Sequence, residues 1–371
     1  MSRTLLVTND FPPTVGGIQS YLRDFLATLD PEQVVVFAST QDRAAAAAHD
    51  AGLPYRVIRW PRHVMLPTPT TAEAMSQIIR ELDIDTVWFG AAAPLALMGA
   101  AARRAGATRI IASTHGHEVG WSMLPGARRV LRRIGDTADV VTYISDYTLR
   151  RVRRAFGPHP EFRHLPSGVD VDWFRPATPE ERADTRERHG TGPLVVCVSR
   201  LVPRKGQDML IGVWPQVLER HPTARLLIVG SGSHEAVLRR MAAPLGDAVA
   251  FTGPLSTPDL RSLLASADVF AMPARTRGGG LDVEGLGIVY LEAQACGVPV
   301  IAGDSGGAPE TVTPETGIVV DGRSGEELTA ALLQLLDDPP HAAALGEAGR
   351  RHVTDSWTWD IMGARLRDIL R

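Results

Sequence analysis

The sequence predicts an α/β protein built from two doubly wound domains, each a parallel sheet flanked by helices. Three observations support this fold class. The chain has 371 residues, 44% of them hydrophobic, which suits two cores better than one. Short β-branched runs alternate with segments whose apolar residues have helical spacing. A turn-rich stretch over residues 165–182 interrupts the alternation, which restarts at Pro193.

The first half alternates strands with helices from its beginning. β-Branched and apolar runs predict strands over residues 3–10, 33–39, 55–60, 85–90, 109–114 and 140–145. Helical spacing of apolar residues predicts helices over 18–29, 72–83, 94–105 and 126–135, with the alanine run 44–48 as a further helical segment. This order indicates a parallel sheet with right-handed crossovers.

The second half repeats the pattern. Strands are predicted over residues 194–200, 224–232, 249–255, 269–274, 299–304 and 317–320, and helices over 207–221, 234–243, 257–267 and 287–296. Residues 356–371 form an amphipathic helix that could pack on either domain. We therefore assign 1–168 to an N-terminal domain completed by the helix of 355–371, and 169–354 to a C-terminal domain facing it across a cleft.

Composition narrows the classes of function. The net charge is −3, which gives no indication of a nucleic-acid partner. No apolar run approaches the roughly 20 residues of a membrane span, and no signal peptide is recognisable, so we expect a cytoplasmic protein. Cys197 and Cys296 lie in apolar runs and predict buried thiols. One stretch is locally basic, with eight arginines between Arg128 and Arg154.

Ligands of such domains bind at the carboxyl ends of the strands, so the loops there are the candidate sites. After the first strand, Gly16 and Gly17 precede a helix whose N-terminal N–H groups suit a phosphate. An ordinary turn is the alternative. The dinucleotide fingerprint G-x-G-x-x-G is absent, which disfavours an NAD-dependent oxidoreductase.

A histidine pair follows the strand of residues 109–114. His115 and His117 have a spacing that could ligate a metal, but no third ligand has a matching position, so we expect no metal. We expect the His115 imidazole to donate a hydrogen bond to a polar substrate. A loop histidine satisfied by its neighbours is the alternative.

Two cations follow the first strand of the second domain. Arg200 is followed five residues later by Lys205, the one lysine among 39 basic residues. A planar guanidinium and a compact ammonium can hold different oxygens of one diphosphate. A chance surface pair is the alternative.

Two carboxylates belong to the stretch "EGLGIVYLE". Glu292 lies in the first turns of a helix that begins near Gly287, where it can accept two hydroxyls of a ribose. The N–H groups of Gly287, Ile288 and Val289 suit a phosphate. Glu284 lies outside the helix and is free to meet the other end of the ligand. A glutamate that only complements the helix dipole is the alternative.

Together these segments resemble the retaining glycosyltransferases of family 4, which have the GT-B fold. The resemblance rests on "FPPTVGGIQSYL", "THGHE", "YISDYT", "LPSGVDVDWFRP", "SRLVPRKG", "LLIVGSG", "FTGPL", "DVFAMPA" and "EGLGIVYLEAQACGVPVIAG", which follow in order over most of the chain. Within the family, the pattern is most similar to actinobacterial mannosyltransferases that use GDP-mannose to elongate phosphatidylinositol mannosides. The approach to Glu284, "ARTRGGGLDVEG", is longer than the shortest family loops.

The resemblance implies a role for each candidate residue. Arg200 and Lys205 would neutralise the donor diphosphate, with Gly16 and Gly17 contacting it from the other domain. Glu292 would bind the ribose, while Glu284 and His115 would bind the transferred sugar. It also implies front-face transfer with retention, without metal or cofactor. Alternatives are a UDP-sugar donor or another acceptor, and, in another class, a two-lobed sugar-binding protein without chemistry.

The basic stretch gains a candidate role from this resemblance. An acceptor of the phosphoinositol glycolipid type lies in an anionic membrane, which basic side chains could dock at the inner face of the plasma membrane. The candidates lie on the predicted helix 126–135, and they are Arg128, Arg129, Arg132 and Arg133. A solvated helix face is the alternative.

Overall fold

The computed structural model describes residues 3–371 and divides the chain into two compact units. Unit 1 contains the residues up to Ser167 together with Trp359–Arg371, and unit 2 contains Gly168–Thr358. The sequence had placed these divisions after residue 168 and before residue 355. Each unit holds one parallel sheet with helices, so the α/β class with two doubly wound sheets is confirmed.

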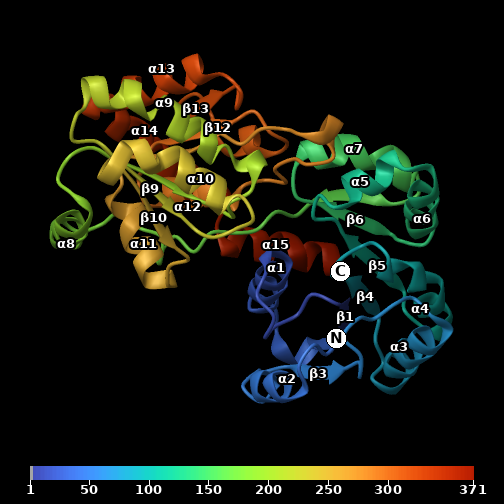
Figure 1. The fold of residues 1–371 in the computed structure, drawn as a ribbon. Helices are drawn as coiled ribbons and strands as arrows, with labels where there is room; N and C mark the ends of the chain where they lie inside the picture. Colours follow the sequence, from blue (N-terminus) through green and yellow to red (C-terminus); the bar gives the residue numbers. More distant parts are fainter. Residues whose placement is uncertain (1–2) are drawn as a thin grey trace. The chain divides into compact units, whose positions relative to one another are not determined.

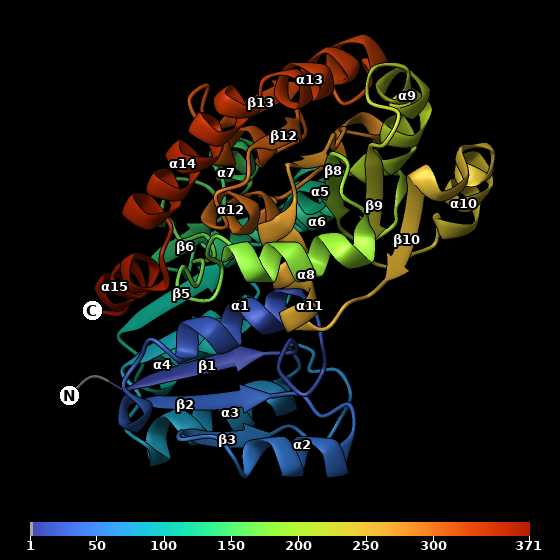
Figure 2. The same cartoon turned by 90° about the vertical axis from the view of Figure 1, so that its left-hand side faces the viewer.

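The sheet of unit 1 has seven parallel strands in the order β3-β2-β1-β4-β5-β6-β7. The strand bounds are β1 Thr4–Thr8, β2 Val34–Ala38, β3 Arg56–Arg59, β4 Thr86–Phe89, β5 Arg109–Ser113, β6 Val140–Tyr143 and β7 Glu161–His164. Every residue of β1 and β2 is buried, as expected where helices cover both faces. Figure 2 shows β1, β2 and β3 side by side in this order.

Three helices of unit 1 begin at capping residues that the sequence supplies. The side chains of Asp42, Thr68 and Ser145 each accept a hydrogen bond from a backbone N–H of the first turn that follows. The bounds are α1 Gly17–Leu26, α2 Arg43–Asp50, α3 Pro69–Glu81, α4 Gly99–Ala105, α5 Glu118–Met123, α6 Pro125–Gly135 and α7 Asp146–Phe156, with 3₁₀ turns η1 Pro31–Gln33 and η2 Leu95–Met98. Helices α5 and α7 and strand β7 were not predicted from the sequence.

The last helix, α15 (Trp359–Leu370), packs on unit 1 and runs beside α1 (Figure 1). Trp359 meets Phe25 edge to face with ring centroids 5.1 Å apart. Arg109 Nε donates a hydrogen bond of 2.7 Å to the Ile369 carbonyl. The amphipathic pattern of residues 356–371 therefore belongs to the N-terminal core.

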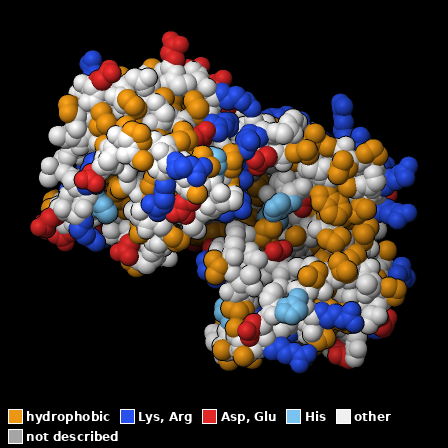
Figure 3. Space-filling model, in the orientation of Figure 1, with side chains coloured by type: hydrophobic (Ala, Val, Ile, Leu, Met, Phe, Trp, Pro, Cys, Tyr) orange, Lys and Arg blue, Asp and Glu red, His pale blue; other side chains and the backbone are white. Residues whose placement is uncertain are grey.

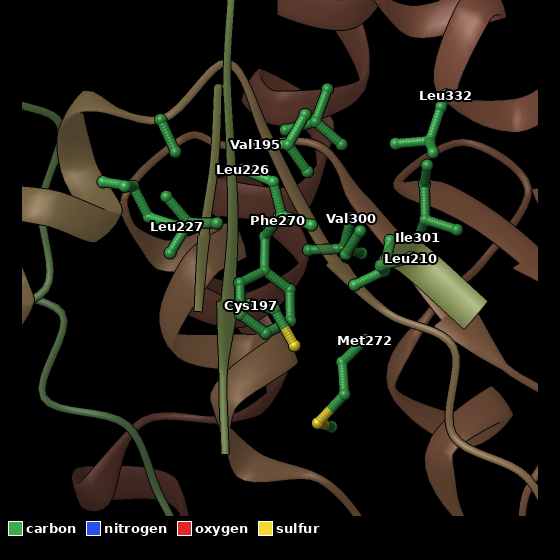
Figure 4. Close-up of a cluster of buried hydrophobic side chains, with 14 of the residues drawn as sticks. Val195, Cys197, Leu210, Leu226, Leu227, Phe270, Met272, Val300, Ile301 and Leu332 are labelled. Carbon is green, nitrogen blue, oxygen red and sulfur yellow. The ribbon is translucent and has the colours of Figure 1, made fainter. Parts of the chain in front are cut away.

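The sheet of unit 2 has six parallel strands in the order β10-β9-β8-β11-β12-β13. The bounds are β8 Leu194–Val198, β9 Arg225–Val229, β10 Val249–Gly253, β11 Val269–Met272, β12 Val300–Gly303 and β13 Gly317–Val320. Phe270 and Met272 from β11 pack with Val195 and Cys197 from β8 and Ile301 from β12 in the core (Figure 4). The two cysteines of the chain are buried free thiols.

The helix bounds in unit 2 are α8 Pro179–His189, α9 Gln207–Arg220, α10 Glu235–Ala242, α11 Thr257–Ser266, α12 Ile288–Ala295, α13 Gly325–Asp337 and α14 Pro339–Ser356, with 3₁₀ turns η3 Pro203–Lys205, η4 Ala243–Ala248, η5 Gly278–Gly280 and η6 Ala308–Thr311. Three of the helices described in unit 2, α8, α13 and α14, were not predicted from the sequence. Helix α8 begins inside the stretch predicted as turns, where Thr178 and Glu181 form a capping box. Among the described helices, none is long and apolar enough to cross a membrane.

Candidate functional site

In unit 2, close backbone contacts bring the loops after three strands together at the carboxyl edge of the sheet. Gly206 follows η3 with φ +79°, and a Cβ there would lie 2.1 Å from the Pro273 carbonyl at the end of β11. Gly306, after β12, has φ +59°, and a Cβ there would lie 1.9 Å from the Glu284 carbonyl. Only glycine tolerates both the positive φ and the missing space. The loops after β8, β11 and β12 therefore form one surface.

Lys205 and Glu284 form an ion pair on this surface. Lys205 Nζ lies 2.5 Å from Glu284 Oε2, and the two side chains are 10% and 9% exposed. The Glu284 backbone is held on both sides, because its N–H donates to Ser305 Oγ at 3.2 Å and its carbonyl accepts from Gly307 at 3.0 Å. Glu284 is thus paired with a cation, and its expected contact with a ligand stays a prediction. A buried carboxylate needs a countercharge, and the cation predicted for a diphosphate provides it.

Arg204 is a third charged residue beside this pair, and it was not predicted from the sequence. Its Nε lies 3.9 Å from Glu284 Oε2, and one terminal nitrogen lies 3.4 Å from Asp282 Oδ1. The adjacency of two cations in "PRKG" was the available signal. Arg200 differs, because it is exposed and no described residue hydrogen-bonds to its guanidinium. The two cations predicted to bind a diphosphate thus lie in one loop, where Arg200 is exposed and Lys205 is buried.

Glu292 lies on α12, where the helix begins after Gly287. Gly287 is the N-cap with φ +86°, so the first N–H groups, including those of Ile288 and Val289, lack partners within the helix. Glu292 is half-buried, and burial raises the pKa of its carboxyl from 4.5 to about 7. No described residue donates a hydrogen bond to this carboxyl. The site thus pairs unpartnered N–H donors with an unpartnered acceptor, as a phosphate and a diol require.

In unit 1, Gly16 and Gly17 lie at the start of α1. Gly16 is the N-cap in an extended conformation, with no side chain satisfying the first N–H groups of the helix. A Cβ on Gly17 would meet no atom within 4 Å, and one on Gly16 would meet only the Gln19 side chain. Packing inside the unit therefore does not demand these two glycines, whereas close approach of a ligand would.

His115 follows β5 and is bound to the protein through one ring nitrogen. Its Nε2 lies 2.6 Å from the Gly90 carbonyl, and its ring meets Tyr21 edge to face at 4.8 Å. Burial lowers the pKa of His115 to about 4, so the ring is neutral at pH 7. A carbonyl only accepts, so Nε2 carries the hydrogen and Nδ1 is left as an acceptor. The expectation that His115 donates to a substrate is therefore corrected, because its donor is occupied.

The other residues of "THGHE" behave differently. Glu118 is buried and its Oε2 accepts the His115 backbone N–H at 3.0 Å, which fixes the start of α5. His117 is exposed. Within residues 3–371, no three His, Cys, Asp or Glu side chains are placed to hold a metal ion together.

The predicted basic helix is α6, and its four arginines are exposed: Arg128, Arg129, Arg132 and Arg133. Basic side chains project along the edge of unit 1 where α6 lies (Figure 3). Three of the four line a hollow of about 430 Å³ together with Arg154 and Met123. Leu124, next to Met123, is 60% exposed. This edge therefore combines positive charge with exposed apolar side chains.

Comparison with known proteins matches both halves of the chain. The family described as "Glycosyltransferase Family 4" matches residues 15–173, and "Glycosyl transferases group 1" matches residues 179–352. A Corynebacterium glutamicum protein named "GDP-mannose-dependent monoacylated alpha-(1-6)-phosphatidylinositol monomannoside mannosyltransferase" is 66% identical over 100% of this chain and 98% of its own. A Mycolicibacterium smegmatis protein named "GDP-mannose-dependent alpha-(1-6)-phosphatidylinositol monomannoside mannosyltransferase" is 58% identical over 99% of this chain and 97% of its own.

Solved structures resemble the whole chain as well. Anabaena HepE in complex with UDP superposes with a TM-score of 0.82 at 19% identity, covering 100% of this chain and 99% of its own. Sucrose-phosphate synthase from Thermosynechococcus elongatus superposes with a TM-score of 0.79 at 23% identity, covering 99% and 98%. At these identities the likeness concerns the fold alone.

Proposed function

Because this chain belongs to glycosyltransferase family 4 and has the GT-B fold, we propose that it transfers mannose from GDP-mannose to a phosphatidylinositol mannoside, giving an α-linked product. The proposal extends to this chain the activity named for relatives of 66% and 58% identity. One observation from the structure carries it. The unpartnered carboxyl of Glu292 lies on α12, and the Lys205–Glu284 pair lies in the loops of unit 2, where a nucleotide sugar needs an acceptor for its ribose and a cation for its phosphates.

The nucleotide end of the donor would be held by α12 and the loop after β8. Glu292 would accept hydrogen bonds from two ribose hydroxyls, which supply the partners that its carboxyl lacks. The first N–H groups of α12 and the guanidinium of Arg200 would bind the diphosphate. Lys205 has three N–H donors, so it can bind a phosphate oxygen while still contacting Glu284.

Glu284 and His115 are the proposed partners of the sugar end of the donor. Glu284 would accept hydroxyls of the transferred mannose. His115 would accept one hydroxyl at Nδ1, the nitrogen that its Gly90 contact leaves available. Gly16 and Gly17 would let the N–H groups of α1 approach the diphosphate.

The proposed transfer retains the anomeric configuration by attack on the face from which the phosphate departs. The bond from the anomeric carbon to the phosphate oxygen breaks, and a bond from that carbon to the acceptor oxygen forms on the same face. The acceptor hydroxyl gives its proton to the departing phosphate. Arg200, Lys205 and helix N–H groups stabilise the charge that develops on that phosphate, with no need for a divalent ion.

The test is transfer of radiolabelled mannose from GDP-mannose to extracted membrane lipids, with linkage analysis of the product. We expect label in phosphatidylinositol mannosides when GDP-mannose is the donor and none from UDP-sugars. No transfer to a competent acceptor would refute the specific assignment. Binding of GDP without turnover on any acceptor would instead support a sugar-binding protein without chemistry.

Docking at the anionic inner face of the plasma membrane is part of the proposal, because the acceptor is a lipid. Exposed arginines on α6 attract an anionic surface at about 1 kcal/mol each. We expect wild type to bind vesicles rich in anionic lipid and to bind them less as salt is added. The double variant Arg128→Glu, Arg129→Glu should lose this binding. The control carries the same two changes at Arg43 and Arg104, which are exposed elsewhere on unit 1. Equal loss in both double variants, or binding that ignores lipid charge, would refute a docking role for α6.

A further inference from the structure

We propose that Arg204 is a positioning residue: it holds Glu284 and the hairpin before it, and so orients the sugar during transfer. This inference rests on the proposed function. Arg204 lies in η3, directly before Lys205, and its side chain is 15% exposed. The two consecutive cations therefore approach one buried carboxylate, with Lys205 at 2.5 Å and Arg204 at 3.9 Å from Glu284 Oε2.

The hairpin before Glu284 depends on contacts from outside itself. Arg277 and Asp282 exchange backbone hydrogen bonds of 2.8 and 3.2 Å, which close the hairpin. Its tip is Gly278–Gly280, three glycines with positive φ, and such a tip has many alternative conformations. The local sequence therefore closes this hairpin but does not fix where it lies.

Arg204 supplies two of the contacts that fix the hairpin. Its guanidinium contacts Asp282, the closing residue, at 3.4 Å, and its carbonyl accepts the Arg275 N–H at 2.8 Å. Arg275 is held in turn by Asp208, with an ion pair of 2.6 Å. The segment around η3 thus contacts the hairpin near both of its ends, at Arg275 and at Asp282. Glu284 lies two residues after Asp282.

Arg204 also keeps a countercharge on Glu284 while Lys205 is shared with a diphosphate. When Lys205 contacts a phosphate, its positive charge is shared between the phosphate and Glu284. A buried carboxylate whose charge is only partly compensated lowers the stability of the protein. The Arg204 Nε is buried and makes no hydrogen bond with any described residue. It is therefore available for Glu284, whose Oε2 lies 3.9 Å away. Arg204 acts through Glu284 and the hairpin and has no contact with the diphosphate in this proposal.

The test compares Arg204→Ala with Arg277→Ala, the same change at an exposed arginine of the same hairpin. Kinetics with GDP-mannose and a phosphatidylinositol mannoside are combined with GDP affinity, measured by calorimetry. GDP has no sugar for Glu284 to orient. We expect Arg204→Ala to lower kcat by about 10- to 100-fold, as misplacement of a binding group by about 1 Å does, while the Kd for GDP changes by less than about twofold. Arg277→Ala should change neither value by more than about twofold.

Two further variants keep the result interpretable. Asp282→Asn removes the charge that Arg204 contacts and should also lower kcat. Adding it to Arg204→Ala should cause little further loss of kcat, because the effects of residues that act as one unit are not additive. Arg204→Lys replaces the alanine variant in the comparison if that variant does not fold, and it should show the same split between kcat and GDP affinity. Loss of GDP affinity equal to the loss of kcat, or additive effects of Arg204 and Asp282, would overturn the inference. An inactive wild-type protein would instead refute the proposed function.

Discussion

Glu292→Gln is expected to stabilise unit 2 at alkaline pH and to weaken nucleotide binding. Burial raises the pKa of Glu292 from 4.5 to about 7, so the folded chain holds this proton more tightly than the unfolded chain. The folded state therefore loses stability as pH rises from about 4.5 through about 7. A difference of two and a half pKa units corresponds to about 3 kcal/mol, and solvent screening of a half-buried group lowers the expected effect to about 2 kcal/mol.

Glutamine does not titrate, so the variant lacks this loss. Urea denaturation at several pH values should show Glu292→Gln more stable than wild type by about 2 kcal/mol at pH 8 and no more stable near pH 4.5. Glu187→Gln, an exposed change in the same unit, is the control and should give a difference that does not vary with pH. A Glu292→Gln protein that is less stable than wild type at pH 8 would refute the reasoning.

The same carboxyl links stability to binding. The ionised carboxylate accepts at both oxygens without a donor of its own, whereas the protonated form turns one oxygen into a donor, so GDP should bind wild type more tightly at pH 8 than at pH 6. Calorimetry on Glu292→Gln should show weaker binding with no such pH dependence. If the variant keeps wild-type affinity and the same pH dependence, Glu292 does not bind the ribose.

Three further outcomes are expected. Lys205→Ala leaves a buried carboxylate without its main partner, so it should lower the free energy of unfolding by about 3 kcal/mol and also abolish turnover. Adding Glu284→Ala should restore stability but not activity, and denaturation curves and transfer assays measure the two effects. The low pKa of His115 means that the unfolded chain takes up the proton first as pH falls from 6.5 to about 4, so unit 1 should lose stability over that range and His115→Asn should lose less, as thermal melts at each pH would show. Gly306→Ala places a Cβ 1.9 Å from the Glu284 carbonyl, so kcat should fall by about tenfold or more while GDP affinity stays unchanged; unchanged kcat would show that Glu284 tolerates displacement.

Hydrophobic patterning predicted the strands of the two cores and missed several other elements, two of which bury little surface. The strands of unit 2 were all predicted, because both faces of its sheet are covered and each strand is a short apolar run. Strand β7 has no buried residue and lies at the edge of its sheet, and α8 buries only Thr185. Such elements carry weak periodicity, so capping residues such as Thr178 were the better signal.

The sequence predicted individual residues of the candidate site but not the contacts between them. The loops after β8 and β11 were identified because ligands bind at the carboxyl ends of parallel strands. The contact between Lys205 and Glu284 joins positions far apart in the chain, and residue spacing carries no information about it. The lone lysine suggested a phosphate ligand and gave no sign that its loss would also destabilise the protein. The occupied donor of His115 depends on the Gly90 carbonyl, which no side-chain pattern reports.

The return of α15 to unit 1 has a consequence for synthesis of the protein. Unit 2 is inserted within unit 1 along the chain, since residues 168–358 separate the two parts of the N-terminal unit. Domains usually fold one after another as they leave the ribosome. Here α15, the last helix that packs on the seven-stranded sheet, is synthesised only after the whole of the second unit. Until then the surface of Phe25 that Trp359 covers is open to other chains. A chain truncated just before α15 should therefore be prone to aggregation, although its inserted unit is complete and able to fold.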